Sequence, residues 1–159
     1  MEWLPGIICC DGRNWVEIVE SIYPIFRRDF IDSRPTLDGM EVRLREAPLL
    51  DGKDRTFWHF VTQGFDDRNR IPDLHRCERI GWVRSVIDHA NDPRLRRWEQ
   101  QRQGSTSVAI ALPNFEYIVF LGRRQPLNGA PYFLALTAYN VDSPRKRERH
   151  RKEWQAYVR

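Results

Sequence analysis

The chain has 159 residues, of which 41% are hydrophobic and 30% charged, and its formal net charge is +4. This composition is typical of one folded domain with its own core and excludes a largely disordered chain. No apolar run approaches the ~20 residues of a membrane span and the N-terminus lacks the pattern of a signal peptide, so we expect a cytoplasmic protein with no membrane partner.

The first predicted element is a helix over residues 14–31. Asn14 is suited to cap it, with Glu17 three residues later, and apolar side chains such as Ile22 recur at helical spacing. We expect a kink at Pro24, because an interior proline removes a backbone donor and crowds the preceding turn.

The next segments alternate between strand-like and helical patterns. Residues 40–44 alternate like a strand, and residues 55–63, rich in aromatic and β-branched side chains, favour a strand slightly over a helix. A polar loop over residues 66–73 then leads into a second helix over residues 74–89, which carries one apolar stripe.

The last third predicts a short charged helix, three strands and a final helix. The charged helix spans residues 93–103, the strands span residues 107–112, 115–121 and 132–139, and the final helix begins near Pro144. Short links between the strands favour antiparallel neighbours. The order predicts an α+β fold in which N-terminal helices pack on one face of a C-terminal antiparallel sheet, leaving the other face or its rim for a ligand.

The positive charge is concentrated at the C-terminus. Residues 145–159 contain seven Lys or Arg against two Glu, a balance of +5, so the remainder of the chain sums to about −1. We therefore divide the chain into one domain over residues 1–143 and a basic helix or tail over residues 144–159, which Trp154 can anchor. A localised basic face suits a polyanion, and a solvated helix carrying charge for solubility is the alternative.

His59 is the candidate that we single out among the four histidines. Phe57, Trp58 and Phe60 surround it in sequence and would hold it in a partly desolvated place where its pKa can be tuned. A buried histidine satisfied by a backbone carbonyl is the alternative.

Arg76 and Arg79 are three residues apart on the predicted second helix. Two guanidinium groups there could clamp a phosphate and stabilise charge that grows on it. Pairing with Glu78 or Asp73 on a solvated face is the alternative.

Thr137 and Tyr139 alternate along the last strand and so point to the same side of it. Their hydroxyl groups could donate to a phosphate oxygen. Both are also ordinary strand-forming residues, so this pair alone is a weak signal.

We predict neither a metal nor a cofactor. The densest acidic spot is Asp66-Asp67, and adjacent carboxylates in a loop do not make a two-metal site. Cys9, Cys10 and Cys77 form neither a disulfide framework nor a metal knuckle, so we expect them to be reduced and buried. A cysteine nucleophile with a histidine base is the functional alternative, but nothing in the sequence places the two together.

An ordered set of short motifs resembles the phage-associated branch of the BECR (barnase, EndoU, colicin and RelE-like) ribonuclease toxins. The motifs span most of the chain and are Thr56-Phe57-Trp58-His59-Phe60, Arg76-Cys77-Glu78-Arg79-Ile80-Gly81-Trp82, Trp98-Glu99 with Arg102, Tyr117-Ile118-Val119 and Tyr132-Phe133-Leu134 through Thr137-Ala138-Tyr139.

The resemblance implies helices followed by a curved antiparallel sheet whose concave face binds RNA. It implies that His59 is general base or acid and that Arg79, with Arg76, stabilises the phosphorane. It also implies that Thr137 and Tyr139 bind the scissile phosphate.

The expected reaction is cleavage of RNA to a cyclic phosphate. A base takes the proton of the 2′-OH, that oxygen attacks the adjacent phosphorus, and an acid protonates the departing 5′-oxygen, so DNA should survive. Lys152 would assist from the tail, and Tyr139, Lys152 or Glu78 would serve as the second proton carrier.

Two other classes of function remain open. One is a noncatalytic nucleic-acid-binding module that uses the tail for phosphates and exposed aromatic rings for bases. The other is an interaction domain whose basic tail meets an acidic antitoxin or immunity protein. The RNA target, the base preference and the oligomeric state do not follow from the sequence.

Overall fold

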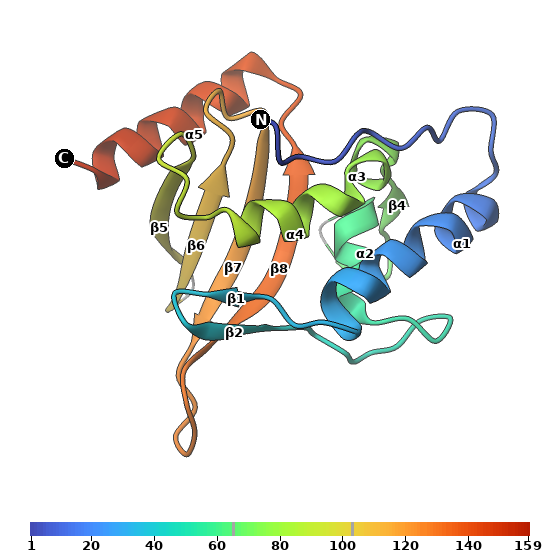
Figure 1. Ribbon diagram of the computed structural model, residues 1–159, viewed down its shortest axis with the longest axis horizontal. Helices are drawn as coiled ribbons and strands as arrows, with labels where there is room; N and C mark the ends of the chain where they lie inside the picture. Colours follow the sequence, from blue (N-terminus) through green and yellow to red (C-terminus); the bar gives the residue numbers. More distant parts are fainter. Residues whose placement is uncertain (65, 103) are drawn as a thin grey trace.

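The computed structural model describes residues 1–64, 66–102 and 104–159. In chain order its elements are α1 (Trp15–Phe26), a π-helix η1 (Arg27–Ile31), β1 (Thr36–Leu37), β2 (Met40–Arg43), α2 (Arg55–Val61), β3 (Thr62–Gln63), β4 (Ile71–Pro72), α3 (Leu74–Glu78), α4 (Ile80–Asp88), β5 (Arg96–Arg102), β6 (Ser105–Ala111), β7 (Tyr117–Arg124), β8 (Tyr132–Asn140) and α5 (Pro144–Tyr157). The fold is α+β, as the sequence predicts (Figure 1).

A six-stranded sheet in the order β1-β2-β8-β7-β6-β5 forms the centre of the molecule (Figure 1). Strands β5 to β8 make an antiparallel meander, which confirms the three strands expected in the last third of the chain. Strand β2 joins β8 in parallel, with Val42 opposite Phe133. The sheet is therefore mixed and not antiparallel throughout. Parallel pairing needs a long connection between the strands, and the segment containing α2, α3 and α4 provides it between β2 and the meander.

The two faces of the sheet pack against different helices. Helix α4 covers one face, on the side of Val108, Ile110, Val119 and Leu121, and α1 packs against α4. Helix α5 covers part of the opposite face through Trp154 (Figure 1). The expectation of helices on one face only is wrong in this respect, since the basic helix packs on the face that was expected to stay open. The rest of that face remains available.

Helix α1 anchors an aromatic cluster beneath α2. The side chain of Asn14 accepts from the backbone N–H of Glu17 at 2.9 Å and donates to its carboxylate at 2.9 Å, which confirms the predicted cap. The α-helix passes through Pro24 and gives way to the π-helix three residues later, so the perturbation appears downstream as a change of helix type. Phe26 is fully buried within this cluster.

Residues 55–63, for which a strand was slightly favoured, are mainly helix α2. Thr56, Phe57, Phe60 and Val61 are its buried residues, at the spacing of one helical face. Phe57 and Phe60 pack against Phe26 with ring centroids 5.3 and 6.0 Å apart. The aromatic composition misled the prediction, because these rings fill a helix–helix contact and do not lie on a pleated sheet.

The helix predicted over residues 93–103 is also wrong, because this segment contains strand β5, and Gln103 lies outside the described residues. The strand pairs with β6 along its whole length. Trp98 is buried on one face, and on the other Glu99 accepts a hydrogen bond from Arg123 at 2.7 Å. The charges that suggested a solvated helix are instead cross-strand partners.

The predicted helix over residues 74–89 is divided into α3 and α4 at Arg79, whose backbone angles (φ −113°, ψ 20°) leave the helical region. The final basic helix is confirmed as α5. Ser143 caps it through the backbone N–H of Lys146, and His150 is buried against the sheet. No helix among the described residues has the length and apolar character needed to cross a membrane.

Replacing Phe26 by Ala should lower the free energy of unfolding by about 3–5 kcal/mol, because a ring that is 0% exposed leaves a cavity in the aromatic cluster. Val16 lies on the same helix but is 68% exposed, so Val16→Ala should change stability by no more than about 0.5 kcal/mol. Urea denaturation of both variants is the measurement, and equal effects would contradict the packing described.

Candidate active site

An open cleft of about 490 Å³ lies between α2, the loop that follows β3, and β8. Its lining is basic and polar, with one histidine and one tyrosine, and consists of Arg55, His59, Gly64, Asp66, Asp67, Arg70, Arg76, Thr137 and Tyr139. The cleft therefore joins a helix, a loop and a strand that are far apart in the sequence.

His59 and Asp67 form a hydrogen-bonded pair at this cleft. The Nε2 atom of His59 lies 2.9 Å from Oδ1 of Asp67, and the other carboxylate oxygen forms an ion pair with Nε of Arg55 at 2.9 Å. The aromatic rings of α2 that face the core fix the helix, and His59 projects from its opposite side. If Nε2 carries the proton and donates to Asp67, Nδ1 is the nitrogen that can accept a proton.

The surroundings lower the pKa of His59 below its ordinary value. Partial burial is the main cause and the charge of Arg70 adds to it, whereas the hydrogen bond and charge of Asp67 act in the opposite direction. Burial alone would raise the pKa of Asp67, but the hydrogen bond from His59 and the charge of Arg55 outweigh it, so that pKa is also lowered. At neutral pH the pair is an uncharged imidazole beside a carboxylate.

Arg76 lies beneath the cleft and ties three elements together. Its Nη1 donates to the backbone carbonyls of His59 at 2.9 Å and Thr62 at 2.7 Å, and to the hydroxyl of Thr137 at 3.3 Å. Its Nε forms an ion pair with Asp73 at 3.3 Å. Burial lowers the pKa of Arg76, but a guanidinium stays charged at any ordinary pH, so a permanent cation lies under the cleft.

Arg70 brings a second positive charge to the rim. Its guanidinium donates to the hydroxyl and carbonyl of Thr62 at 2.8 and 2.6 Å and to the carbonyl of Gly64 at 3.1 Å. All of these acceptors are neutral, so the hydrogen bonds hold the side chain in place without neutralising it. This arrangement suits an anionic ligand.

A bulge in β8 determines which side chains face the cleft. Phe120 pairs with Thr137 and Leu121 pairs with Ala135, so Leu136 has no partner in the ladder. Thr137 and Tyr139 lie on the same side, as their alternation predicts, and both line the cleft. The hydroxyl of Thr137 also donates to the carbonyl of His59 at 3.4 Å, which couples β8 to α2.

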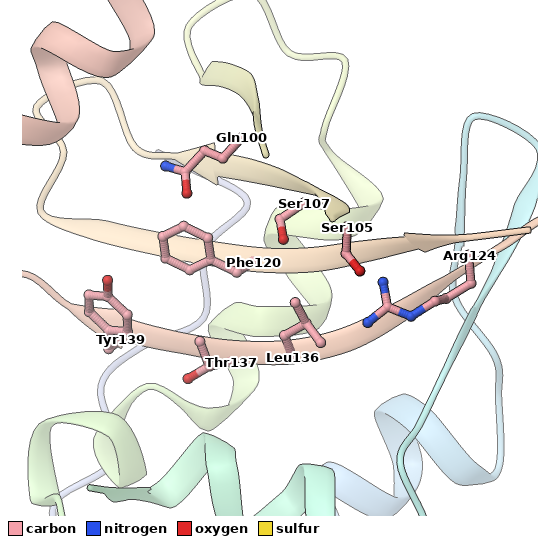
Figure 2. Close-up of a pocket in the computed structure, with 8 residues that line it drawn as sticks. All are labelled: Gln100, Ser105, Ser107, Phe120, Arg124, Leu136, Thr137 and Tyr139. Carbon is pink, nitrogen blue, oxygen red and sulfur yellow. The ribbon is translucent and has the colours of Figure 1, made fainter. Parts of the chain in front are cut away.

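A second hollow continues from the cleft across the open face of the sheet. It has a volume of about 340 Å³ and is lined by Gln100, Ser105, Ser107, Phe120, Arg124, Leu136, Thr137 and Tyr139. Figure 2 shows these side chains rising from neighbouring strands, with the Arg124 guanidinium directed toward Ser105. Thr137 and Tyr139 belong to both hollows, so the two form one continuous surface.

Two predicted site residues lie elsewhere. Arg79 donates to the carbonyl of His75 at 3.0 Å and to the carboxylate of Glu78 at 3.2 Å, and it does not line the cleft. Lys152 is exposed on α5, where it lines a separate groove with Arg145 and other basic residues. The cleft therefore brings together His59, Arg76, Thr137 and Tyr139 from the predicted set.

The sequence analysis missed Asp67, Arg55 and Arg70. The Asp66-Asp67 pair was noticed and set aside only as a metal site. In the structure Asp66 accepts from the backbone N–H of Asn69 at 3.0 Å and so shapes the loop, which leaves Asp67 to meet His59. An acid within ten residues of a candidate histidine was the one available signal.

The cysteines do not take part in the cleft. Cys10 and Cys77 are buried as expected, but Cys9 is exposed, so the expectation that all three are buried is wrong. Burial raises the pKa of Cys77 to about 12, and its thiol donates to the carbonyl of Val61 at 3.7 Å. Cys77 is thus a core residue and not an activated nucleophile.

Within the described residues, no group of three or more His, Cys, Asp or Glu side chains is arranged to hold a metal ion. The comparisons with known proteins add nothing further, since no family model, curated protein or solved structure matches the chain. The geometry of the cleft is therefore the basis for a function.

The imidazole of His59 should titrate below its ordinary value, and Asp67→Asn should lower its pKa further, because the carboxylate is the group that raises it. NMR titration of the imidazole protons in both proteins measures this. A rise in the pKa of the variant would contradict the geometry of the pair.

Arg76→Met should lower the free energy of unfolding by about 3 kcal/mol, because the carbonyls of His59 and Thr62 each lose a charged donor and the Asp73 carboxylate loses its ion-pair partner. Arg68 is exposed, so Arg68→Met is the matched control and should change stability by no more than about 0.5 kcal/mol. Urea denaturation distinguishes the two, and similar values would show that Arg76 does not hold the elements together.

Proposed function

We propose that this protein is a metal-independent endoribonuclease that cleaves RNA by attack of a 2′-OH on the adjacent phosphorus. The observation that carries the proposal is the His59–Asp67 pair, which faces Thr137 and Tyr139 inside a rim of arginines. A neutral imidazole, cationic donors and a phenol are the groups that this reaction needs.

His59 acts as the general base in this proposal. Its lowered pKa keeps the ring neutral near pH 7, and Asp67 orients it and stabilises the imidazolium that forms when the ring takes the 2′-OH proton. The 2′-oxygen then bonds to phosphorus and the bond to the 5′-oxygen breaks. The products are a 2′,3′-cyclic phosphate and a 5′-hydroxyl.

The arginines and the β8 hydroxyls bind and stabilise the reacting phosphate. Arg70 faces the growing negative charge with no carboxylate bonded to it, and Thr137 donates to a phosphate oxygen. Tyr139 protonates the departing 5′-oxygen, since it lines the cleft and Arg76 lies 5.2 Å from its ring centroid. Arg76 acts through position, because its Nη1 is bonded to the carbonyls of His59 and Thr62 and its Nε pairs with Asp73.

We further propose kinship with the phage-associated BECR toxins. The order of helices before an antiparallel meander, and a site on the open sheet face beside a helix, support it. Arg79 and Lys152, which that resemblance would place in the reaction, take no part in the present proposal, because neither lines the cleft. A cognate antitoxin or immunity protein would meet the basic surface of α5.

A noncatalytic RNA-binding module is the second candidate. The observation that favours it is the groove of about 620 Å³ along α5, whose basic lining comprises Arg145, Lys146, Arg149 and Lys152. Exposed cations of this kind bind a phosphate backbone without any chemistry.

His59→Ala should lower the rate of RNA cleavage at least about 100-fold, because it removes the general base. The assay uses purified protein with total RNA and with DNA in chelator, and the fragment ends are identified. His75→Ala is the matched control, since His75 is exposed on α3 and outside the cleft, and it should keep full activity.

Three results of that assay would overturn the proposal. Intact RNA with retarded mobility in wild type and His59→Ala alike would favour the binding module. Cleavage of DNA at the same rate would remove the 2′-OH from the mechanism. Equal loss of activity in His59→Ala and His75→Ala would remove His59 from it.

A further inference from the structure

The far end of the second hollow contains an arginine that is packed flat on the sheet. A Cβ atom added to Gly122 would lie 2.7 Å from Nη1 and 3.0 Å from Cζ of Arg124. The Arg124 guanidinium therefore occupies the space that any other residue at position 122 would fill. Ser107 pairs with Gly122 across the strands, and both Ser107 and Ser105 line the hollow with this guanidinium, Ser105 being the nearer of the two (Figure 2).

The charge of Arg124 has no carboxylate beside it. Within the described part of the chain neither Arg124 nor Arg45 forms an ion pair, and Arg124 donates only to the carbonyl of Arg123, at 3.0 Å. Burial lowers the pKa of Arg45, and the charges of Arg55 and Arg124 lower it further, whereas the charge of Asp67, which pairs with Arg55, acts in the opposite direction. Arg45 and Arg124 repel each other and neither is held by an ion pair among the described residues, so this end of the surface suits a bound anion.

We propose that Arg124, with Ser105 and Ser107, binds a second backbone phosphate of the RNA strand whose scissile phosphate lies at His59. This inference rests on the proposed function. It predicts that the RNA strand runs from the cleft across β8 to the end of β7 at Arg124. Arg45 adds its charge to this surface, since it interacts electrostatically with Arg55 of the cleft and with Arg124.

The space between the two phosphate positions suits a nucleobase. Phe120 and Leu136 form its apolar floor, and the rings of Phe120 and Tyr139 stack with centroids 5.6 Å apart. A base stacked on this floor would place its two flanking phosphates toward opposite ends of the surface. The α5 groove does not offer this continuity, because it shares no residue with the cleft.

The test measures binding of a short RNA whose 2′-OH at the cleavage position is replaced by hydrogen, so that binding is observed without reaction. Two such RNAs are compared, a tetranucleotide that can reach both phosphate positions and a dinucleotide that carries only the phosphate at His59. Arg124→Gln should weaken binding of the tetranucleotide about tenfold and leave binding of the dinucleotide unchanged. The slope of log Kd against log salt should fall by about 0.7, the value for one phosphate contact on a single strand.

Two further variants make the test specific. Arg123→Gln removes the same charge from the neighbouring residue, whose side chain pairs with Glu99 on the opposite face, and it should leave binding unchanged. Gly122→Ala keeps Arg124 but displaces its guanidinium, so it should weaken binding as Arg124→Gln does. Circular dichroism confirms that each variant is folded.

Equal weakening by Arg123→Gln and Arg124→Gln, or no weakening by Arg124→Gln, would overturn the second phosphate site. This outcome is separate from failure of the proposed function, which shows as intact RNA in the cleavage assay with an unmodified substrate. Wild-type protein that binds neither oligonucleotide would overturn the inference directly.

Discussion

The arrangement of the cleft depends on one largely buried cation. Arg76 donates to carbonyls that end α2 and begin β3, pairs with the cap residue of α3, and reaches the hydroxyl of Thr137 on β8. Burying a guanidinium is costly unless its donors are satisfied, so the same contacts that satisfy Arg76 also fix the relative positions of these elements. Because one of the carbonyls belongs to His59, the backbone that carries the imidazole is held directly.

The fixed positions of these groups determine the protonation state of His59. Burial and Arg70 favour the neutral ring, whereas Asp67 favours the charged ring and restricts its orientation. The two influences oppose each other, so the ring is a neutral base that can still accept a proton when one is offered. If Asp67 were absent the ring would be neutral over a wider pH range but would be less able to hold the proton that it takes.

The parts of this fold that follow local rules could be predicted from the sequence, and the parts set by distant contacts could not. The capped helix at Asn14, the β6–β8 meander and α5 were correct, since periodicity and turn residues determine them. The secondary structure predicted for residues 55–63 and 93–103 was wrong, because it was inferred from aromatic and charged composition. The packing partners decide it instead: α2 packs on Phe26, and β5 pairs with β6. Likewise His59 and Thr137 could be singled out from the sequence, whereas folding alone brings Asp67 next to His59 and Arg124 next to Ser105.

In the folded protein two groups of positive charges can be distinguished, one exposed on α5 and one around the cleft. The sequence concentrates it on α5, where most of the basic side chains are exposed, so salt screens them strongly and their main effect is to attract a polyanion from a distance. The arginines around the cleft are fewer but partly buried, and Arg70 among them is fixed by neutral acceptors. In that less polar setting each charge acts strongly on a ligand at short range. In the proposed function, approach and alignment of the substrate would therefore depend on different basic residues.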